Sequence, residues 1–299
     1  MQYIVQTALE LGAIYALVSL ALFLSFRILN IADMTTDGCF VLGAAVSVSC
    51  ASAGHPILGI FMGMLAGGAA GYVTAFQQTH MGVPDILAGI ITNTGLYTIN
   101  LMAMGWRSNH SLLKDETIFT LFHKTGIGGG WYPLVLAGAI TAIAMILMKL
   151  FLNTRLGLSI RATGDNRDMV SASSIDPRYT ITVGLVAANM MTGLSGAIAG
   201  QFQKAADINS GTGIVVVGLA CLIIGETLCG RSSVRRGVIA TVVGSIVYRF
   251  IYAVVLKTKI VPIECLKLVT AIIVGLAIAM PTIRAWVAFQ RRKAHSARK

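Results

Sequence analysis

The chain has 299 residues, of which 56% are hydrophobic and only 12% are charged. Soluble domains carry roughly 25% charged residues, so the composition excludes an ordinary soluble domain. The net charge of +11 does not indicate a nucleic-acid partner, because the lysines and arginines lie in short loops and a tail between apolar runs, as the positive-inside rule describes.

Long apolar runs alternate with short polar segments along the chain. A membrane-spanning helix needs about 20 mainly apolar residues, and the runs are apolar all round, which excludes the alternating pattern of a transmembrane β-barrel. We predict an all-α polytopic membrane protein of about nine transmembrane helices, within a range of eight to ten. The apolar runs are 3–29, 38–53, 57–78, 85–104, 132–152, 179–200, 212–229, 236–256 and 263–283.

The first two runs differ from the others. The first lacks a basic leading segment and is too long for the apolar core of a signal peptide, so we expect it to be retained. The second, 38–53, is short for a full crossing and is typical of a broken helix. Residues 1–283 are predicted to form a single transmembrane domain, and residues 284–299 a basic tail.

Lysine and arginine set the orientation. If the polar segment 153–178 is placed in the cytoplasm, 14 Lys and Arg residues lie inside and 6 lie outside. This asymmetry favours that orientation. It places the tail in the cytoplasm and, with nine crossings, the N-terminus outside.

A sequence pattern recurs after the first and the sixth run. Ala32–Gly38 and Ala206–Gly211 each begin with Ala-Asp, reach a glycine, and lead into a short glycine-containing apolar run. On the orientation above the two breaks face opposite sides of the membrane, which indicates an inverted-topology repeat of the kind found in transporters. The candidates for broken helices and a translocation path are therefore Asp33, Asp37, Asp207 and Asn209.

Polar residues inside the apolar runs give further candidates. Asn93, Asn100 and Asn189 are expected to face other helices, where a hydrogen bond is worth on the order of 1 kcal/mol. Asn93 and Asn189 are added to the pathway candidates, as is Arg249, the deepest intramembrane charge, because such residues face a partner or a cavity. For Glu226, near the cytoplasmic boundary, we expect a structural pairing with a nearby arginine.

The sequence gives little support for an enzymatic function. Gly193-Leu194-Ser195-Gly196 matches the serine motif of intramembrane proteases, but all five histidines lie in predicted loops or the tail, out of reach of that serine. We interpret Gly193, Gly196 and Gly200 as small residues that permit close helix packing. The five cysteines form no CxxC pair, so we expect no metal site, no catalytic residue and no cofactor.

The polar segment 153–178 is predicted to contain a short helix from Asp165 to Ser174, with Gly164 or Asp165 as its cap and acidic residues in its first turn. Pro177 prevents its continuation. A helix that carries Arg167, Asp168 and Met169 in the cytoplasm fits a docking site for a soluble partner. An ordinary solvated connector explains the same residues equally well.

Several segments resemble a known family. Thr154-Arg155-Leu156-Gly157-Leu158 with Arg161-Ala162, followed by Ser171 to Asp176, is similar to the cytoplasmic loop of ABC importer permeases of the branched-chain amino acid and ribose type. Asp33–Gly38 and Ala206–Gly213 resemble a subgroup linked to tryptophan or tyrosine uptake. The resemblance covers nearly the whole chain, and the family usually has glycine at position 174, where this chain has serine.

The resemblance implies a type II-like importer in a bacterial plasma (inner) membrane. Its expected partners are a cytoplasmic ABC ATPase, an extracellular or periplasmic substrate-binding protein, a second permease copy in a homodimer, and the lipid bilayer, with no nucleic acid. The chain itself has no P-loop motif, so ATP would be hydrolysed by the separate subunit. The implied ATPase-coupling residues are Arg161, Gly164, Asp165, Arg167, Asp168, Met169, Ser174 and Asp176.

The cargo implied is a small solute, most simply an amino acid, with an aromatic one suggested by the subgroup. An ion-coupled secondary transporter is the alternative. It would explain the repeat and the buried charges but not a cytoplasmic docking helix. The outer polar segment 105–131 is long enough to form a small cap on which a binding protein docks, or it is a plain connector.

Overall fold

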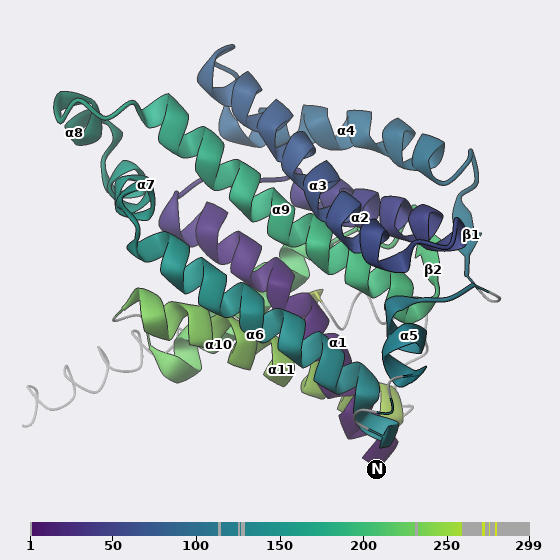
Figure 1. Ribbon diagram of the computed structural model, residues 1–299. Helices are drawn as coiled ribbons and strands as arrows, with labels where there is room; N and C mark the ends of the chain where they lie inside the picture. The colour runs from purple at the N-terminus through teal and green to yellow at the C-terminus, as the bar shows by residue number, and fades with distance from the viewer. Residues whose placement is uncertain are drawn as a thin grey trace, which may run out of the picture.

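The computed structural model describes residues 2–112, 115–124, 126, 129–230 and 233–258, together with 271, 272, 275 and 279. The described chain is mostly helical (Figure 1). Its helices are α1 (Gln2–Leu22), the π-helix η1 (Phe23–Ile28), α2 (Thr36–Ser52), α3 (Pro56–Thr79), α4 (Asp85–Ala103), α5 (Ile118–Lys124), the 3-10 helix η2 (Gly129–Trp131), α6 (Tyr132–Asn153), α7 (Arg155–Asp165), α8 (Arg167–Ala172), α9 (Pro177–Gln203), α10 (Ile214–Cys229) and α11 (Val234–Thr258). The described residues also form two strands, β1 (Asn109–Ser111) and β2 (Ala205–Asp207).

The helices confirm the all-α class of membrane protein, with two short strands as the described exceptions. Six helical segments in the described part of the chain are long and apolar enough to span a membrane, and α2 and α10 are shorter apolar helices. The short helix predicted at 38–53 is α2, as expected. The predicted run 263–283 and the tail 284–299 fall almost wholly outside the described residues.

Helix α9 lies between two groups of helices (Figure 1). On one side it packs against α2 and α3, with α4 beyond them, and on the other side it contacts α1, which in turn packs against α6, α10 and α11. The helices α7 and α8 lie at one end of this bundle, and the strands, α5 and the N-terminus lie at the other. We call these the α7–α8 end and the β1–β2 end.

Glycines allow α9 to approach its neighbours closely. An alanine Cβ at Gly193 would lie 2.5 Å from the carbonyl oxygen of Gly63 in α3, and one at Gly200 would lie 3.2 Å from Cα of Ala44 in α2. A Cβ at Gly196 would collide with the carbonyl oxygen of Phe40. The prediction that these glycines serve close packing is confirmed, and it accounts for the short distances between these helices.

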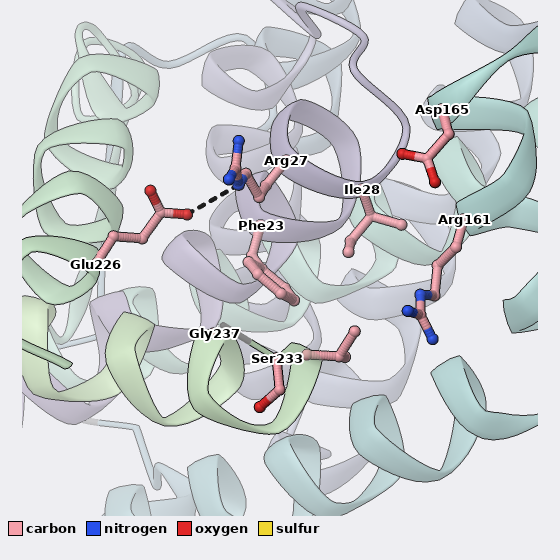
Figure 2. A pocket seen from close by; sticks show the side chains of 9 residues that line it. Phe23, Arg27, Ile28, Arg161, Asp165, Glu226, Ser233 and Gly237 are labelled. Carbon is pink, nitrogen blue, oxygen red and sulfur yellow. Dashed lines mark ion pairs between the residues drawn. The ribbon is translucent and has the colours of Figure 1, made fainter. Parts of the chain in front are cut away.

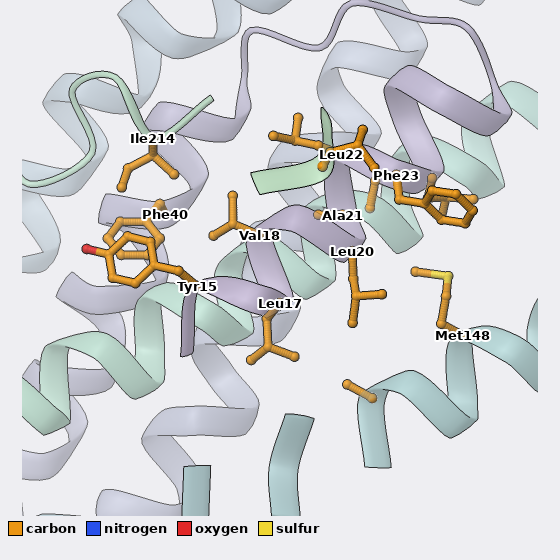
Figure 3. Close-up of a cluster of buried hydrophobic side chains, with 14 of the residues drawn as sticks. Tyr15, Leu17, Val18, Leu20, Ala21, Leu22, Phe23, Phe40, Met148 and Ile214 are labelled. Atoms are coloured by element: carbon orange, nitrogen blue, oxygen red, sulfur yellow. The ribbon is translucent and has the colours of Figure 1, made fainter. Parts of the chain in front are cut away.

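Helix α1 is the most enclosed of the long helices. Together with η1 it forms the apolar segment Val5–Ile28, and 83% of the most apolar part of that segment is buried inside the protein. Leu17, Val18 and Leu20 are each 0% exposed and form the core of the larger hydrophobic cluster (Figure 3). A helix that is apolar all round is stable where protein surrounds it, and α1 satisfies that condition.

The two chain breaks predicted from the repeat have the same local hydrogen bonds. Asp33 Oδ1 accepts from the Thr35 backbone N–H at 2.9 Å, and Asp207 Oδ1 accepts from the Asn209 N–H at 2.7 Å. Three residues after each aspartate a hydroxyl, of Thr36 or Ser210, donates to the aspartate's own carbonyl. Each Ala-Asp sequence therefore forms an Asx-type turn.

The half-helices that follow these turns run in opposite directions. Helix α2 ends at the β1–β2 end, where Ser49 donates to the Ala103 carbonyl at the end of α4 at 2.6 Å. Helix α10 ends at the α7–α8 end, where Glu226 pairs with Arg27 of η1. Their first turns meet inside the bundle, as the contact of Asp37 with Gly213 shows.

The outer polar segment contains one of the two short strands of the described fold. β1 pairs with β2 in an antiparallel sheet, with Asn109 opposite Asp207 and Ser111 opposite Ala205. Lys204, in left-handed conformation at the end of α9, turns the chain into β2, and its carbonyl accepts from the Leu112 N–H. The polar segment is thereby fastened to the second chain break.

Candidate translocation site and coupling surface

A polar cavity lies where α2, α4 and the segment before α10 meet. Its volume is about 500 Å³. Three of the predicted pathway residues, Asp37, Asn93 and Asn209, come together in its wall. The complete lining is Asp37, Gly38, Val41, Asn93, Thr94, Tyr97, Thr98, Asn100, Ile208, Asn209, Gly211 and Thr212.

Asp37 joins the two half-helices. It lies in the first turn of α2, and its carboxylate accepts from the first turn of α10: Oδ2 from the Gly213 N–H at 3.0 Å and Oδ1 from the Val215 N–H at 2.9 Å. Both helix N-termini carry partial positive charge, each equivalent to roughly half an elementary charge. One carboxylate therefore compensates two helix dipoles in the interior of the bundle.

Helix α4 supplies the opposite wall. Its amide side chains Asn93 and Asn100 flank Gly38: a Cβ at Gly38 would collide with Asn93 Oδ1, and Asn100 Nδ2 donates to the Gly38 carbonyl at 3.3 Å. Asn100 is 2% exposed, and its Oδ1 has no partner among the described residues. Glycine at position 38 thus lets the polar face of α4 reach the start of α2.

Sequence reasoning did not single out Thr94, Tyr97 and Thr98, and it named Asn100 only as one of three asparagines expected to face other helices. The signal was present, because with Asn93 these residues fall at i, i+1, i+4, i+5 and i+7, the spacing of one helix face. A polar stripe on a helix that is otherwise apolar marks a face turned towards a cavity or a partner.

Asp33 and Asn189 lie apart from this cavity. Asn189 Nδ2 donates to Asp33 Oδ2 at 2.6 Å, and both residues are buried, with 0% and 3% of their surfaces exposed, respectively. Asp33 also receives the Thr35 N–H, and the Thr35 hydroxyl lies 2.8 Å from that of Thr74 in α3. This network ties the first chain break to α3 and α9.

The remaining intramembrane charges have other surroundings. The Arg249 guanidinium stacks over Tyr15 at 3.6 Å from the ring centroid, and Tyr252 lies at 5.8 Å, a cation–π arrangement outside the cavity wall. Asp207 lies in β2, beside the cavity, and accepts from Asn109 Nδ2 at 3.4 Å. Glu226 pairs with Arg27 Nε at 3.1 Å, a partner that sequence reasoning did not single out.

At the α7–α8 end the predicted short helix Asp165–Ser174 is present as α8, Arg167–Ala172, but it starts two residues later than expected and follows a second helix, α7, that was not predicted. Asn166 separates them: its side chain accepts from the Met169 N–H at 3.0 Å and so caps α8. Gly164 and Asp165, expected to cap that helix, instead belong to the last turn of α7. Asparagine is among the strongest N-cap residues, which explains why a new helix starts there.

The predicted coupling residues divide between these two helices. Arg161 and Asp165 of α7 line a cavity of about 330 Å³ that also contains Arg27 and Glu226 (Figure 2). Gly164 sits against the carbonyl of Ile28, so α7 is fixed to η1. The α7 residues therefore face the bundle.

Helix α8 faces away from the bundle. Arg167, Asp168 and Met169 are exposed, with Met169 at 55%, whereas Val170 is buried at 1%. Arg167 Nη2 lies 3.4 Å from Asp85 Oδ2 at the start of α4, the same helix that lines the polar cavity. This contact is an exposed ion pair between α8 and α4.

The turn after α8 contains the two remaining coupling residues. Ser174 has φ +60°, the left-handed region that favours glycine. Asp176 is extended and caps α9, accepting from the Arg178 N–H at 2.9 Å. The position at which the resembled family usually has glycine is therefore the one that needs a positive φ.

Comparisons with known proteins find a family and several related chains. The model of a family described as "Branched-chain amino acid transport system / permease component" matches residues 4–284. The chain is 33% identical to a tyrosine transport system permease protein of Clostridioides difficile over 87% of this chain and 85% of that protein. It is 30% identical to the uncharacterized protein RP368 of Rickettsia prowazekii over 91% of this chain and 96% of that protein.

A more distant match is the D-allose transport system permease protein AlsC of Escherichia coli, 26% identical over 65% of this chain and 59% of that protein. No solved structure matches the chain significantly.

Proposed function

The chain belongs to the family of permease components of branched-chain amino acid transport systems, and we propose that its cargo is an aromatic amino acid. It is a multi-pass inner-membrane permease subunit of an ABC importer, a transport subunit rather than an enzyme. The cargo proposal rests on the 33% identity to a protein named for tyrosine transport and on a polar cavity with a tyrosine in its wall.

The translocation path is proposed to pass through this polar cavity. The observation that carries this proposal is the junction of α2 and α10 at Asp37, where two half-helices direct their N-termini at one carboxylate. Transporters place substrates where broken helices meet near the bilayer midplane. The matching Asx turns at Asp33 and Asp207 support an inverted repeat as the origin of this arrangement.

Coupling to ATP hydrolysis is proposed to run through α7 and α8. The exposed residues Arg167, Asp168 and Met169 of α8 form the surface that contacts a cytoplasmic ATPase, while Arg161 and Asp165 connect α7 to the bundle. The Arg167–Asp85 contact then links the ATPase surface to α4 and the cavity. A binding protein would deliver cargo at the β1–β2 end, and a second copy of the chain would complete a homodimer.

Purification of the full chain from its native membrane tests this account. We expect a P-loop ATPase to copurify in stoichiometric amount, and the reconstituted complex to accumulate L-tyrosine only with ATP and the binding protein. A complex whose ATPase carries a substituted P-loop lysine is the control. Uptake of L-tyrosine by the chain alone, driven by an ion gradient, would instead establish the secondary-transporter alternative.

A further inference from the structure

The π-helix η1 continues α1 at the α7–α8 end of the bundle and is wound more loosely than the helix before it. The Leu29 N–H donates to the Leu24 carbonyl, five positions back, at 3.0 Å, and the Ile31 N–H donates to the Ser25 carbonyl, six positions back, at 2.9 Å. Single π-helical turns are rare and lie frequently at functional sites. This end of α1 is therefore a candidate hinge.

Two glycines bring neighbouring helices into direct contact with η1. A Cβ at Gly164 of α7 would collide with the Ile28 carbonyl oxygen, and a Cβ at Gly237 of α11 would lie 2.5 Å from the Phe23 ring. Because no free space separates α7 from η1 at Gly164, a movement of α7 towards the bundle must displace the end of α1. The contact with α7 is therefore suited to transmit a movement to η1.

The ion pair of Arg27 and Glu226 joins η1 to α10. Arg27 Nε lies 3.1 Å from Glu226 Oε1, and the Glu226 side chain is 5% exposed whereas that of Arg27 is 45% exposed. Glu226 lies in the last turn of α10, and the first turn of the same helix is bonded to Asp37 in the wall of the polar cavity. The 16 residues of α10, a helix about 24 Å long, therefore connect the ion pair to that cavity.

A second carboxylate lies on the other side of Arg27. Arg27, Glu226 and Asp165 of α7 line the same cavity of about 330 Å³, and Figure 2 shows the two carboxylates on opposite sides of Arg27. Among the described residues neither Asp165 nor Arg161, four positions earlier on α7, forms an ion pair. The Arg27 side chain borders an open space and has room to turn from one carboxylate to the other.

We infer that Arg27 exchanges carboxylates during transport, from Glu226, its partner in this structure, to Asp165 when the ATPase moves α7. Arg27 is thus a positioning residue that holds α10 in the first state and releases it in the second. The pair with Glu226 is favoured at rest, because a buried carboxylate is costly to leave unpaired whereas the exposed Asp165 is solvated. The inference rests on the proposed function and deepens it, since it names the contact by which a movement of α7 reaches the polar cavity.

ATP hydrolysis by the complex that copurifies with the full chain, in lipid nanodiscs, tests the exchange. Glu226→Gln removes the resting partner of Arg27, so we expect hydrolysis in the absence of binding protein to rise about threefold or more. Addition of Asp165→Asn should cancel this rise, because the second pair can then no longer form. If Glu226 had only a structural role, loss of an exposed carboxylate on another helix would not reverse its effect.

The single variant Asp165→Asn tests the second state and does not depend on the folding of Glu226→Gln. We expect its thermal midpoint to be unchanged and ATP-driven uptake of L-tyrosine to fall about threefold or more, and Asp165→Glu should restore uptake. Arg155→Gln neutralises an exposed charge near the start of the same helix and is the matched control. It should take up L-tyrosine at the parent rate.

Three results would overturn the inference. They are parent-rate hydrolysis by the Glu226→Gln complex, a raised rate that persists when Asp165→Asn is added, and full uptake in Asp165→Asn. The parent complex keeps the proposed function separate, because its ATP-driven uptake stands whatever these variants do. A parent complex without ATP-driven uptake would remove the proposed function, and the exchange with it.

Discussion

Asp37 in α2 and Val215 in α10 are 178 positions apart, yet the Asp37 carboxylate accepts the Val215 backbone N–H at 2.9 Å. This bond joins the starts of two half-helices that run towards opposite ends of the bundle. Neither half-helix is long enough to span the membrane alone. The Asp37 carboxylate therefore links the two half-helices, and Asp37 also lines the proposed path.

Removal of this carboxylate should weaken the junction. Asp37→Ala deprives the backbone N–H groups of Gly213 and Val215, at the start of α10, of their acceptor, and loss of an N-cap costs about 0.5–2 kcal/mol. We expect the thermal midpoint of the purified chain to fall by several degrees and ATP-driven uptake to be lost. Asp168→Ala is the control for the thermal midpoint alone, because Asp168 is exposed on α8, which faces away from the bundle. An unchanged midpoint in Asp37→Ala would contradict the capping role.

The contact of α9 with α3 should tolerate no side chain at Gly193. In Gly193→Ala the added Cβ would lie 2.5 Å from the Gly63 carbonyl oxygen, and such overpacking costs typically about 1–3 kcal/mol. Thermal unfolding in detergent would measure the loss. Gly138→Ala in α6, where a Cβ meets nothing within 4 Å, should leave the midpoint unchanged or raise it. Equal effects of the two substitutions would refute the packing argument.

Replacement of Ser174 by glycine should stabilise the turn between α8 and α9. A non-glycine residue in left-handed conformation costs about 1–2 kcal/mol, so Ser174→Gly should slow amide hydrogen exchange across the turn between α8 and α9. The neighbouring substitution Ser173→Gly, at a residue with φ −90°, should accelerate exchange instead. Faster exchange in Ser174→Gly would show that the serine side chain stabilises the turn.

Reversal of charge at Arg167 should uncouple transport without destabilising the chain. Exposed ion pairs contribute only about 0–1 kcal/mol, so loss of the 3.4 Å contact with Asp85 cannot unfold the protein. We expect Arg167→Asp to insert normally but to reduce substrate-stimulated ATP hydrolysis severalfold. Arg155→Asp, at an exposed site near the start of α7, is the matched control.

The reciprocal exchange separates the Arg167–Asp85 contact from a direct contact with the ATPase. If the link to α4 transmits the signal, Asp85→Arg combined with Arg167→Asp should restore part of the coupling. If Arg167 acts only by touching the ATPase, the double variant will be as defective as the single one. Full coupling in Arg167→Asp would remove the residue from the mechanism.

The sequence predicted some of these features and not others, for physical reasons. The apolar runs and the Ala-Asp breaks are local signals, so the spans and the half-helix α2 could be expected. The division of 153–178 into α7 and α8 could also have been found, because Asn166 is a strong cap, but the acidic residues beside it suggested an earlier start.

The cavity depended on tertiary packing. Asp37, Asn93 and Asn209 were recognised one by one, but nothing local indicates that Asp37 reaches Val215. Asp33 and Asn189 carry the same kinds of side chain, and only the close approach of α3 and α9 buries them as a pair. The strands β1 and β2 are three residues each, too short for any periodic signal.

Obstruction of the cavity tests the central claim most directly. Thr94 of α4 lines it, so Thr94→Cys should be alkylated by a bulky maleimide in the complex reconstituted with its ATPase and binding protein. ATP-driven uptake of L-tyrosine should then stop while ATP hydrolysis continues. Ile91→Cys, in the apolar groove on the same helix, should retain uptake after labelling. Undiminished uptake in a fully alkylated Thr94→Cys variant would show that the cargo takes another route.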